Sequence, residues 1–249
     1  MGLKPTSHYM VGHADSPSTA RKLILLSIEF SGEPKLIYKF IEMSSSFGIE
    51  VLSHVVQKSP FTEFSKATFL LNVSDPKQNL PKLLSEVRNE KGVAKAEVMD
   101  APISPGESRF IVFTVADLNS FFKLFKELGT GGQAMLYHLG MKVGQDLADR
   151  ITAHCKDRLT ALDHSLLYME SLGYGYFKIE EYVDQKRCKI TIRDSMECSG
   201  HTAITSNSHL LRGLLAGILS RLWNKKVMAQ EVRCMAKGDN QCEIVIKAE

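Results

Sequence analysis

The chain has 249 residues, of which 44% are hydrophobic and 24% are charged, and its formal net charge is +3. This composition is typical of a globular protein with a sizeable core, and the length suits one large domain or two ordinary ones. Basic residues form no block, so we expect no nucleic-acid surface, and five cysteines are too few for a disulfide scaffold.

The first twenty residues lack the apolar segment of a secretory signal, and we interpret residues 1–20 as a flexible leader. The most apolar helix-like run, residues 210–223, contains two arginines. It is shorter than the roughly 20 apolar residues that a membrane-spanning helix needs. The sequence therefore predicts a cytoplasmic protein without a membrane span.

Residues 21–100 alternate between strand and helix patterns. Strands are predicted at 22–30, 49–57, 66–74 and 93–100, and helices at 34–47 and 78–92. Pro81 fits the first turn of the second helix, and Gly92 fits its end. The order βαββαβ predicts a ferredoxin-like fold, an antiparallel sheet with two helices on one side.

The order and lengths of these elements resemble an ACT domain, a small regulatory module that often binds amino acids. Many ferredoxin-like domains share this order, so the resemblance is one of topology. ACT domains that bind amino acids usually have an acidic residue and a glycine in the loop after the first strand, where this chain has Gly32 in "EFSGEPKL". Two roles stay open for this half: amino-acid binding, and pairing with a second copy.

Two prolines and a glycine in residues 101–108 predict a linker, so we place a second domain at 109–249. Its pattern begins with a predicted strand at 109–117, and Asp117 is expected to cap the helix that follows. The further predictions are helices at 118–129, 131–155, 158–173 and 206–223, and strands at 174–184, 187–197, 226–235 and 241–247. Both halves together predict an α+β protein.

The helix sequences "GGQAMLYHLGMKVGQDLA" and "RGLLAGILSRLW", followed by "EVRCMAKGDNQCEI", carry a more specific signal. In this order they resemble the 4-vinyl reductase domain family, over about residues 108–249. That family includes sensor domains of phenol-responsive transcription activators and hydrocarbon-binding proteins. More distantly, it includes subunits of the TRAPP tethering complex. The resemblance implies a TRAPP-like α+β fold and a small-molecule sensor.

The resemblance also implies a structural zinc ion, because metal-bearing members bind zinc through the residues that match Glu231, Cys234 and Cys242. A further cysteine of those members falls at Ser208 in this chain, and a hydroxyl is a poor zinc ligand beside a thiolate. Cys198 is our candidate for the remaining position, with His201 and His209 as alternatives.

The residues themselves leave other interpretations open. Cys234 and Cys242 share the parity of Val232, Ile244 and Ile246, so both thiols could fill an apolar core, and a redox pair is a third possibility. Glu231 would point to the opposite face of a regular strand. A β-bulge near Gln230 would bring it to the same side as the cysteines.

Each of the two long helices contains a G-x-x-x-G pair, Gly140 with Gly144 and Gly213 with Gly217. The glycines allow tight helix packing or, alternatively, leave room for a small apolar or aromatic ligand. The candidate ligand-lining residues are Tyr137, His138, Tyr176, Phe177 and Trp223.

These observations predict a ligand-responsive regulatory protein that forms a homodimer and passes its signal to a protein partner. We expect no catalytic residues, because Asp163, His164 and Ser165 are adjacent in sequence and do not by themselves form a triad. The alternatives are an interaction scaffold of the transport-particle type and an enzyme accessory in reductive metabolism.

Overall fold

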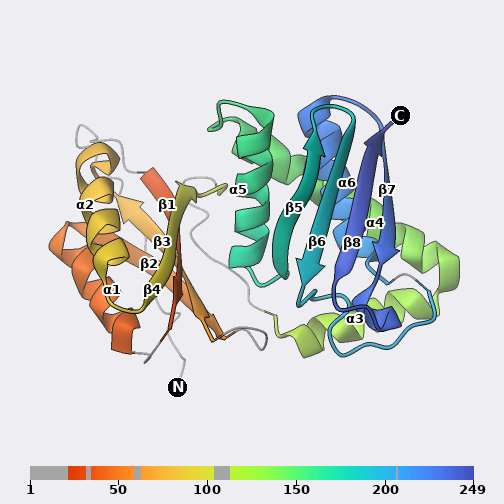
Figure 1. Ribbon diagram of the computed structural model, residues 1–249, viewed down its shortest axis with the longest axis horizontal. Coiled ribbons are helices and arrows are strands. Elements are labelled where there is room, and N and C mark those ends of the chain that lie inside the picture. The colour runs from red at the N-terminus through yellow and green to blue at the C-terminus, as the bar shows by residue number, and fades with distance from the viewer. Residues whose placement is uncertain (1–21, 32–34, 59–62, 104–112, 206) are drawn as a thin grey trace, which may run out of the picture.

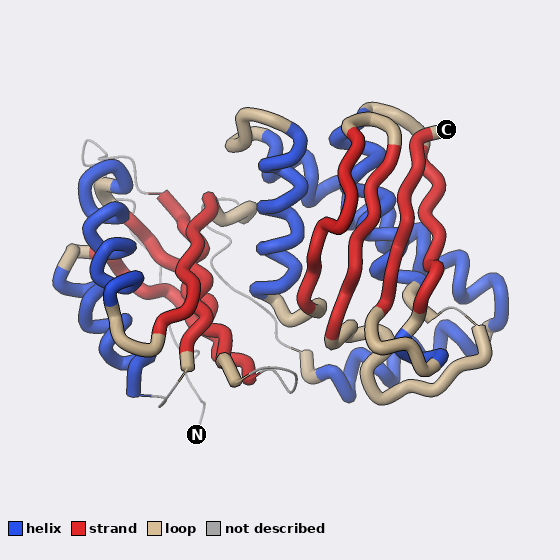
Figure 2. The backbone as a smooth tube through the Cα atoms, in the orientation of Figure 1, coloured by secondary structure: helices blue, strands red, loops and turns tan. Residues whose placement is uncertain are grey.

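The computed structural model describes residues 22–31, 35–58, 63–103, 113–205 and 207–249. These residues form two four-stranded antiparallel sheets with helices, which confirms the α+β class (Figures 1 and 2). The leader predicted at 1–20, Gly32 and most of the predicted linker lie outside the described residues. In the described part of the chain, no helix is long and apolar enough to cross a membrane.

The first sheet has the predicted βαββαβ order. Its elements are β1 (Lys22–Phe30), α1 (Lys35–Ser46), β2 (Ile49–Lys58), β3 (Ser65–Val73), α2 (Pro76–Asn89) and β4 (Val93–Asp100). The strands pair in the order β2-β3-β1-β4, and all pairs are antiparallel. Helices α1 and α2 cover one face (Figure 1). This is the split βαβ topology of ferredoxin-like folds.

Strand β1 is buried on both faces. Ile24, Leu26 and Ile28 belong to the core beneath α1 and α2, while Leu25 belongs to the core of the second half. Successive side chains of a strand point to opposite faces, so one apolar run serves two cores.

Helix α2 begins earlier than predicted, because Asp75 accepts a hydrogen bond from the Gln78 amide and caps it. The prediction that Pro81 lies in the first turn is wrong, since Pro76 holds that place and Pro81 lies further inside the helix. Pro76 fits the start because its missing N–H would have had no helical partner there.

The second sheet has the order β5-β6-β8-β7. The elements of this half are α3 (Val115–Glu127), α4 (Gly129–Thr152), α5 (Arg158–Ser171), β5 (Tyr176–Val183), β6 (Arg187–Arg193), α6 (His209–Trp223), β7 (Val227–Arg233), a short 3-10 turn (Met235–Lys237) and β8 (Cys242–Ala248). Helices α4 and α6 lie behind the sheet, and α3 lies near its lower end in Figure 1.

The strand predicted at 109–117 is wrong where the structure describes it. Residues 109–112 lie outside the described residues, and Val115 already begins α3. Thr114 is the N-cap rather than Asp117: its hydroxyl accepts from the Asp117 amide, and the Asp117 carboxylate accepts from the Thr114 amide. This reciprocal capping box sets the start of the helix and overrides the β-branched residues before it.

The four paired glycines lie at the contact between α4 and α6. A Cβ atom at Gly140 would collide with the Leu210 carbonyl oxygen, and one at Gly217 would collide with that of Met141. Backbone atoms of one helix therefore occupy the space left by the glycines of the other. The tight-packing interpretation is confirmed, and these glycine faces leave no room for a ligand.

The two halves share buried contacts, so the predicted domain boundary is also an interface. Lys66 of β3 is 4% exposed, and its ammonium lies 2.6 Å from a carboxylate oxygen of Glu170 on α5. Leu70 and Met99 of the first sheet join the same apolar cluster as Leu166 of α5.

Candidate metal centre

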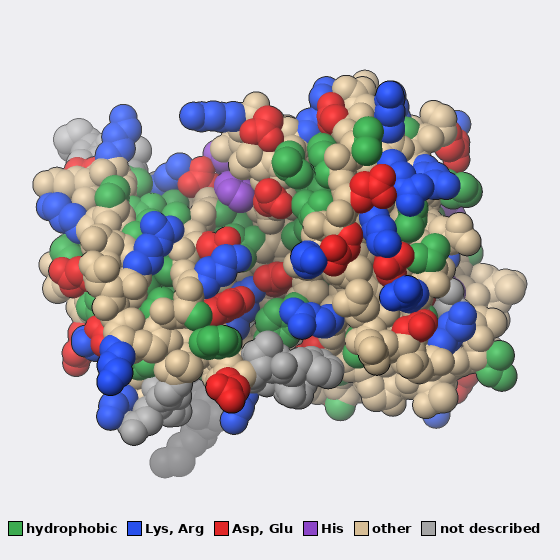
Figure 3. All heavy atoms as spheres, in the orientation of Figure 1, with side chains coloured by type: hydrophobic (Ala, Val, Ile, Leu, Met, Phe, Trp, Pro, Cys, Tyr) green, Lys and Arg blue, Asp and Glu red, His purple; other side chains and the backbone are tan. Residues whose placement is uncertain are grey.

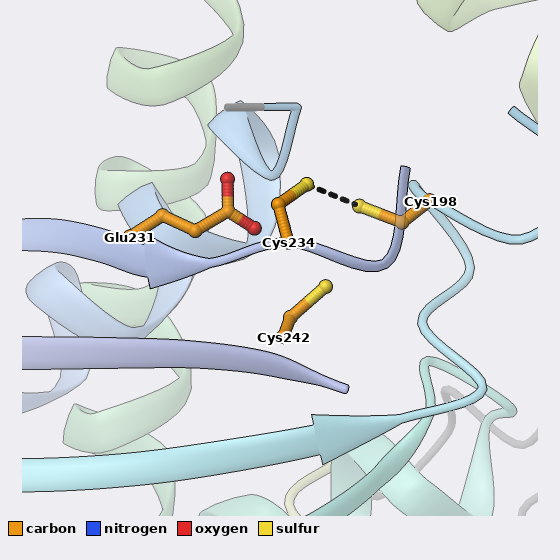
Figure 4. A group of neighbouring side chains, drawn as sticks. All are labelled: Cys198, Glu231, Cys234 and Cys242. Carbon is orange, nitrogen blue, oxygen red and sulfur yellow. Dashed lines mark hydrogen bonds between the residues drawn. The ribbon is translucent and has the colours of Figure 1, made fainter. Parts of the chain in front are cut away.

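Four side chains converge at the end of the second sheet (Figure 4). Cys198 lies in the loop after β6, Glu231 on β7, Cys234 just beyond β7, and Cys242 at the first position of β8. All four are buried, and each offers a ligand atom within 4.8 Å of the others. The structure thus brings together the four residues proposed as metal ligands.

A β-bulge makes this convergence possible. The register between β7 and β8 shifts between Glu231 and Arg233, so Val232 is the extra residue of the bulge. Val232 is 45% exposed while Glu231 is 7% exposed. The sequence predicts a bulge slightly earlier, near Gln230. The assumption that Val232 shares the inward parity of Cys234 is wrong, because the bulge turns Glu231 inward instead.

Ser208 adjoins three of the four side chains of the cluster. Its hydroxyl donates to Glu231 Oε1 at 2.6 Å and lies 3.2 Å from Cys198 Sγ and 3.7 Å from Cys242 Sγ. The second oxygen of Glu231 accepts from the Asn207 and Ser208 amides at 3.0 and 3.2 Å. Ser208, at which the resemblance expects a cysteine, therefore lies where a fourth thiol would meet the site.

A second buried carboxylate anchors the centre to helix α6. Glu197 is fully buried and accepts from the backbone amides of His209, Leu210 and Leu211 at 2.8 to 3.0 Å. Burial raises the pKa of Glu197 to about 7, and these amides oppose the shift. A carboxylate at a helix N-terminus satisfies amides that the helix leaves unpaired. Glu197 thereby fixes the neighbouring Cys198 against α6.

The three thiols are close enough to share protons. Cys198 Sγ lies 3.8 Å from Cys234 Sγ, and the Met235 amide donates to Cys242 Sγ at 3.4 Å. Hydrogen bonds from the Cys234 and Cys242 thiols lower the pKa of Cys198 to about 3. The same contacts raise the pKa of Cys242, and burial raises the pKa of Glu231. The contacts among the thiols thus shift the pKa values of Cys198 and Cys242 in opposite directions.

This donor set fits a tetrahedral zinc ion. Ligands about 2.3 Å from a tetrahedral centre lie about 3.8 Å from one another. The separation of the Cys198 and Cys234 sulfurs is 3.8 Å. Three thiolates and one carboxylate would fill the coordination shell without a histidine. His201 and His209, proposed as alternatives, fall outside the four-residue group in the described part of the chain.

The five predicted ligand-lining residues lie in different surroundings. His138 is exposed and packs edge-on against the half-buried Tyr137. Trp223 is 1% exposed, and its indole nitrogen donates to the Tyr182 hydroxyl at 3.3 Å. Tyr176 lies beneath the Lys66 ammonium, 5.8 Å from it, and Phe177 lines a cleft.

This cleft runs between the two halves and has a volume of about 650 Å³. Its walls come from α2 and β4 on one side and from α5 and β5 on the other. Apolar and charged side chains share the lining, among them Val98, Leu167, Phe177, Arg88 and Asp163. Acidic and basic side chains also alternate over the face drawn in Figure 3.

Sequence reasoning missed Glu197 as a residue of the centre. The sequence pattern places it at the end of a strand, but β6 ends at Arg193 and the chain continues as a loop. The adjacent Cys198 was the available signal. The pairing of Glu197 with amides 12 to 14 residues later is a tertiary contact without a local pattern.

Part of the second half matches a known protein family. The family model of the 4-vinyl reductase domain matches residues 188–248, which include all four cluster residues. The match covers β6, α6, β7 and β8 of the α+β fold.

Two uncharacterized proteins of Methanocaldococcus jannaschii are similar to this chain. One is 27% identical over 122 residues, which is 49% of this chain and 68% of that protein. The other is 26% identical over 128 residues, 51% of this chain and 71% of that protein.

Among solved structures, the phenol-responsive sensory domain of the transcription activator PoxR, bound to phenol, has a TM-score of 0.52. It is 19% identical, and the match covers 58% of this chain and 79% of that chain. At this identity the likeness concerns the fold.

Proposed function

We propose that the chain is a ligand-responsive regulatory protein that binds a small, largely apolar molecule where its C-terminal half faces the first half, and whose C-terminal half holds a structural zinc ion. The observation that carries this proposal is the convergence of three thiols and one carboxylate inside the region that matches the 4-vinyl reductase domain. Similarity of fold to a phenol-responsive sensory domain supports the sensing role. The proposal includes no catalytic activity. It places the protein in the cytoplasm, where thiols stay reduced.

Cys198, Cys234, Cys242 and Glu231 would hold the ion as a closed structural site. Bound zinc would supply a cross-link between the loop after β6, the end of β7 and the start of β8. Around it, Glu197 and the Ser208 and Asn207 amides hold these segments against the start of α6. Loss of the ion would therefore loosen both the β7–β8 hairpin and the N-terminus of α6.

The cleft beside Phe177 is the place we propose for the ligand. Its mixed lining suits an aromatic molecule that carries a polar group, so phenol-type compounds are the first to test. A molecule held there would touch both halves. By linkage, it would shift the protein between two states only through a difference in its affinity for them. An ACT-like role of the first half, a homodimer and a protein partner for output belong to this proposal.

Native mass spectrometry of protein purified without chelator tests the proposal directly. We expect one zinc ion per chain, and an additional small organic mass would identify the ligand class. Cys234→Ser and Cys242→Ser should each remove the zinc and lower the melting temperature. Cys188→Ser is the matched control, because Cys188 is a buried thiol on β6 outside the group. Equal zinc content in all three variants would refute the centre.

An interaction scaffold is the second candidate, and two observations favour it. The glycine faces of α4 and α6 are closed by helix packing. Several large apolar side chains on and between α3 and α4 are more than half exposed: Leu124, Leu128, Met135 and Leu139. Exposed apolar groups of this kind are typical of protein interfaces. If a second copy covers them, Leu128→Glu with Leu139→Glu should convert a dimer to a monomer in light scattering while zinc binding persists.

A further inference from the structure

Strand β7 forms an open edge of the second sheet. It pairs with β8 on one side, and in the described part of the chain no strand pairs with its other side (Figure 1). Its apolar side chains Met228 and Val232 are 58% and 45% exposed. An edge strand offers unpaired backbone N–H and C=O groups to any extended segment that can lie beside it.

The register with β8 shows which backbone groups of this edge are free. The Glu249 amide donates to the Lys226 carbonyl oxygen at 3.0 Å, so these two residues form a hydrogen-bonded pair. Hydrogen-bonded and non-hydrogen-bonded pairs alternate along an antiparallel ladder. Val227 and Ala229 therefore direct their N–H and C=O groups away from β8. The bulge after Glu231 ends this regular stretch.

The charged side chains beside the open edge are basic. Lys225, Lys226 and Arg233 are exposed, whereas Glu231, the acidic residue of the same stretch, is buried. Positive charges along an edge oppose its pairing with the same edge of a second copy. The same charges attract a segment that carries acidic residues.

A hollow of about 440 Å³ adjoins the start of β7. Met141 of α4 and Val227 give it an apolar part, Arg221 and the two lysines of the α6–β7 turn add positive charge, and Glu249 adds one acid. Side chains of a strand added to β7 would alternate between the two faces of the sheet. Those on one face would lie beside the exposed Met228, and those on the other face would reach the hollow.

We propose that β7 is the docking strand for an acidic, extended segment of a protein partner. The segment hydrogen-bonds to the free backbone groups of Val227 and Ala229 and places its carboxylates beside Lys225 and Lys226. In strand addition of this kind, main-chain hydrogen bonds give affinity and side-chain pockets give specificity. Docking at β7 gives the protein a route to its output partner and requires neither the zinc ion nor the small ligand proposed above.

A short fluorescent peptide that alternates glutamate with valine is the probe, and fluorescence anisotropy with the full chain measures its binding. A peptide with lysine in place of glutamate should bind at least about tenfold more weakly, because like charges then meet. The affinity for the acidic peptide should also fall as the salt concentration rises. Hydrogen exchange at the Val227 and Ala229 amides should slow in the complex.

Two variants separate the charges of the edge from its backbone groups. Lys225→Glu with Lys226→Glu should weaken binding of the acidic peptide at least about tenfold. Lys77→Glu with Lys82→Glu is the matched control, because both lysines are exposed on α2 and the net charge changes equally. Ala229→Pro removes a free N–H, which an edge strand tolerates, and should weaken binding about fivefold.

Equal affinity for the two peptides, or no binding of the acidic one, would overturn the proposal. Unchanged hydrogen exchange at both amides in the complex would also overturn it, and that measurement needs no substitution that could affect folding. Binding of phosphatidylserine vesicles in place of the peptide would assign the basic surface to membranes instead. Self-association in light scattering that Ala229→Pro removes would assign the edge to a second copy, against the proposal.

Discussion

The two cores of the molecule contain different kinds of side chain. The core beneath α1 and α2 is built from hydrophobic residues, with Phe40 in edge contact with Phe30 and Phe69. The core of the second half is equally apolar along α4 and α6, but one end buries three thiols and the carboxylates of Glu197 and Glu231.

Apolar packing accounts for the residues of the first core, whereas the buried polar groups of the second core need specific chemical partners. The first core satisfies a simple rule, apolar side chains in the periodicity of strand and helix. The end of the second core breaks that rule, and each buried polar group there has to be satisfied by a specific partner. Sites that break local rules are where function is expected. The predictions below test whether packing and chemistry are separable in this chain.

The packing of α4 on α6 should give the largest effect. A valine at Gly217 would place its Cβ against the Met141 carbonyl oxygen and the Gln145 amide, where no flexible side chain can yield. We expect Gly217→Val to destabilise the protein by more than about 4 kcal/mol. Chemical denaturation measures this loss. Gly131→Ala is the control, because a Cβ there meets open space, and it should be neutral or stabilising.

The ion pair between the halves comes next. Lys66 is 4% exposed and Glu170 is 16% exposed at the side chain. Removing one partner of a buried pair costs about 3–5 kcal/mol, and the lower end applies because Glu170 is partly solvated. Lys66→Met should therefore destabilise the protein by about 3 kcal/mol in a denaturation experiment.

A double variant separates the pair from its surroundings. Glu170 also accepts from the Phe177 amide at 2.7 Å, which a glutamine oxygen can still do. Lys66→Met with Glu170→Gln should therefore be more stable than Lys66→Met alone, since no buried charge is left unpaired. A double variant less stable than either single one would show that the pair does not couple the halves.

Sequence reasoning predicted best the elements that local apolar patterns define. The strand at 22–30 and the strand at 93–100 match β1 and β4 at both ends, because each is a short β-rich run with turn residues nearby. The structure also brings Cys198, Glu231, Cys234 and Cys242 together as predicted. The family resemblance indicated the hairpin residues, and coordination chemistry required a further ligand near them.

The rest depends on contacts between distant segments. The sequence from Phe110 to Val115 carries β-branched and aromatic residues that favour a strand, but the Thr114 capping box starts α3 within that run. Glu197 gains its role only when the loop after β6 meets the start of α6. The hydrophobic periodicity of a short segment does not predict contacts between segments that are distant in the sequence.

A substitution at Ser208 changes the set of metal ligands with little change in the packing around them. A thiolate at this position would lie beside Cys198 and Cys242 and would take the place of the Glu231 carboxylate in the zinc shell. We expect Ser208→Cys to tighten zinc binding by about tenfold, equal to about 1.4 kcal/mol. In cobalt-substituted protein, the thiolate-to-metal absorption should increase. Ser220→Cys, which adds a thiol at the other end of α6, should leave both quantities as in the parent.

The smallest effect is expected where the sequence prediction was wrong, at the start of α3. Thr114→Ala removes the hydroxyl that accepts from the Asp117 amide and should cost about 1 kcal/mol, while Thr114→Ser should keep most of it. The Thr114 hydroxyl and amide lower the pKa of Asp117, so the cap stabilises at neutral pH and weakens as acid protonates the carboxylate. Zinc affinity should not change, because none of the four candidate ligands lies on α3. A loss of zinc affinity in Thr114→Ala would instead mean that the whole of α3 closes over the centre as one unit.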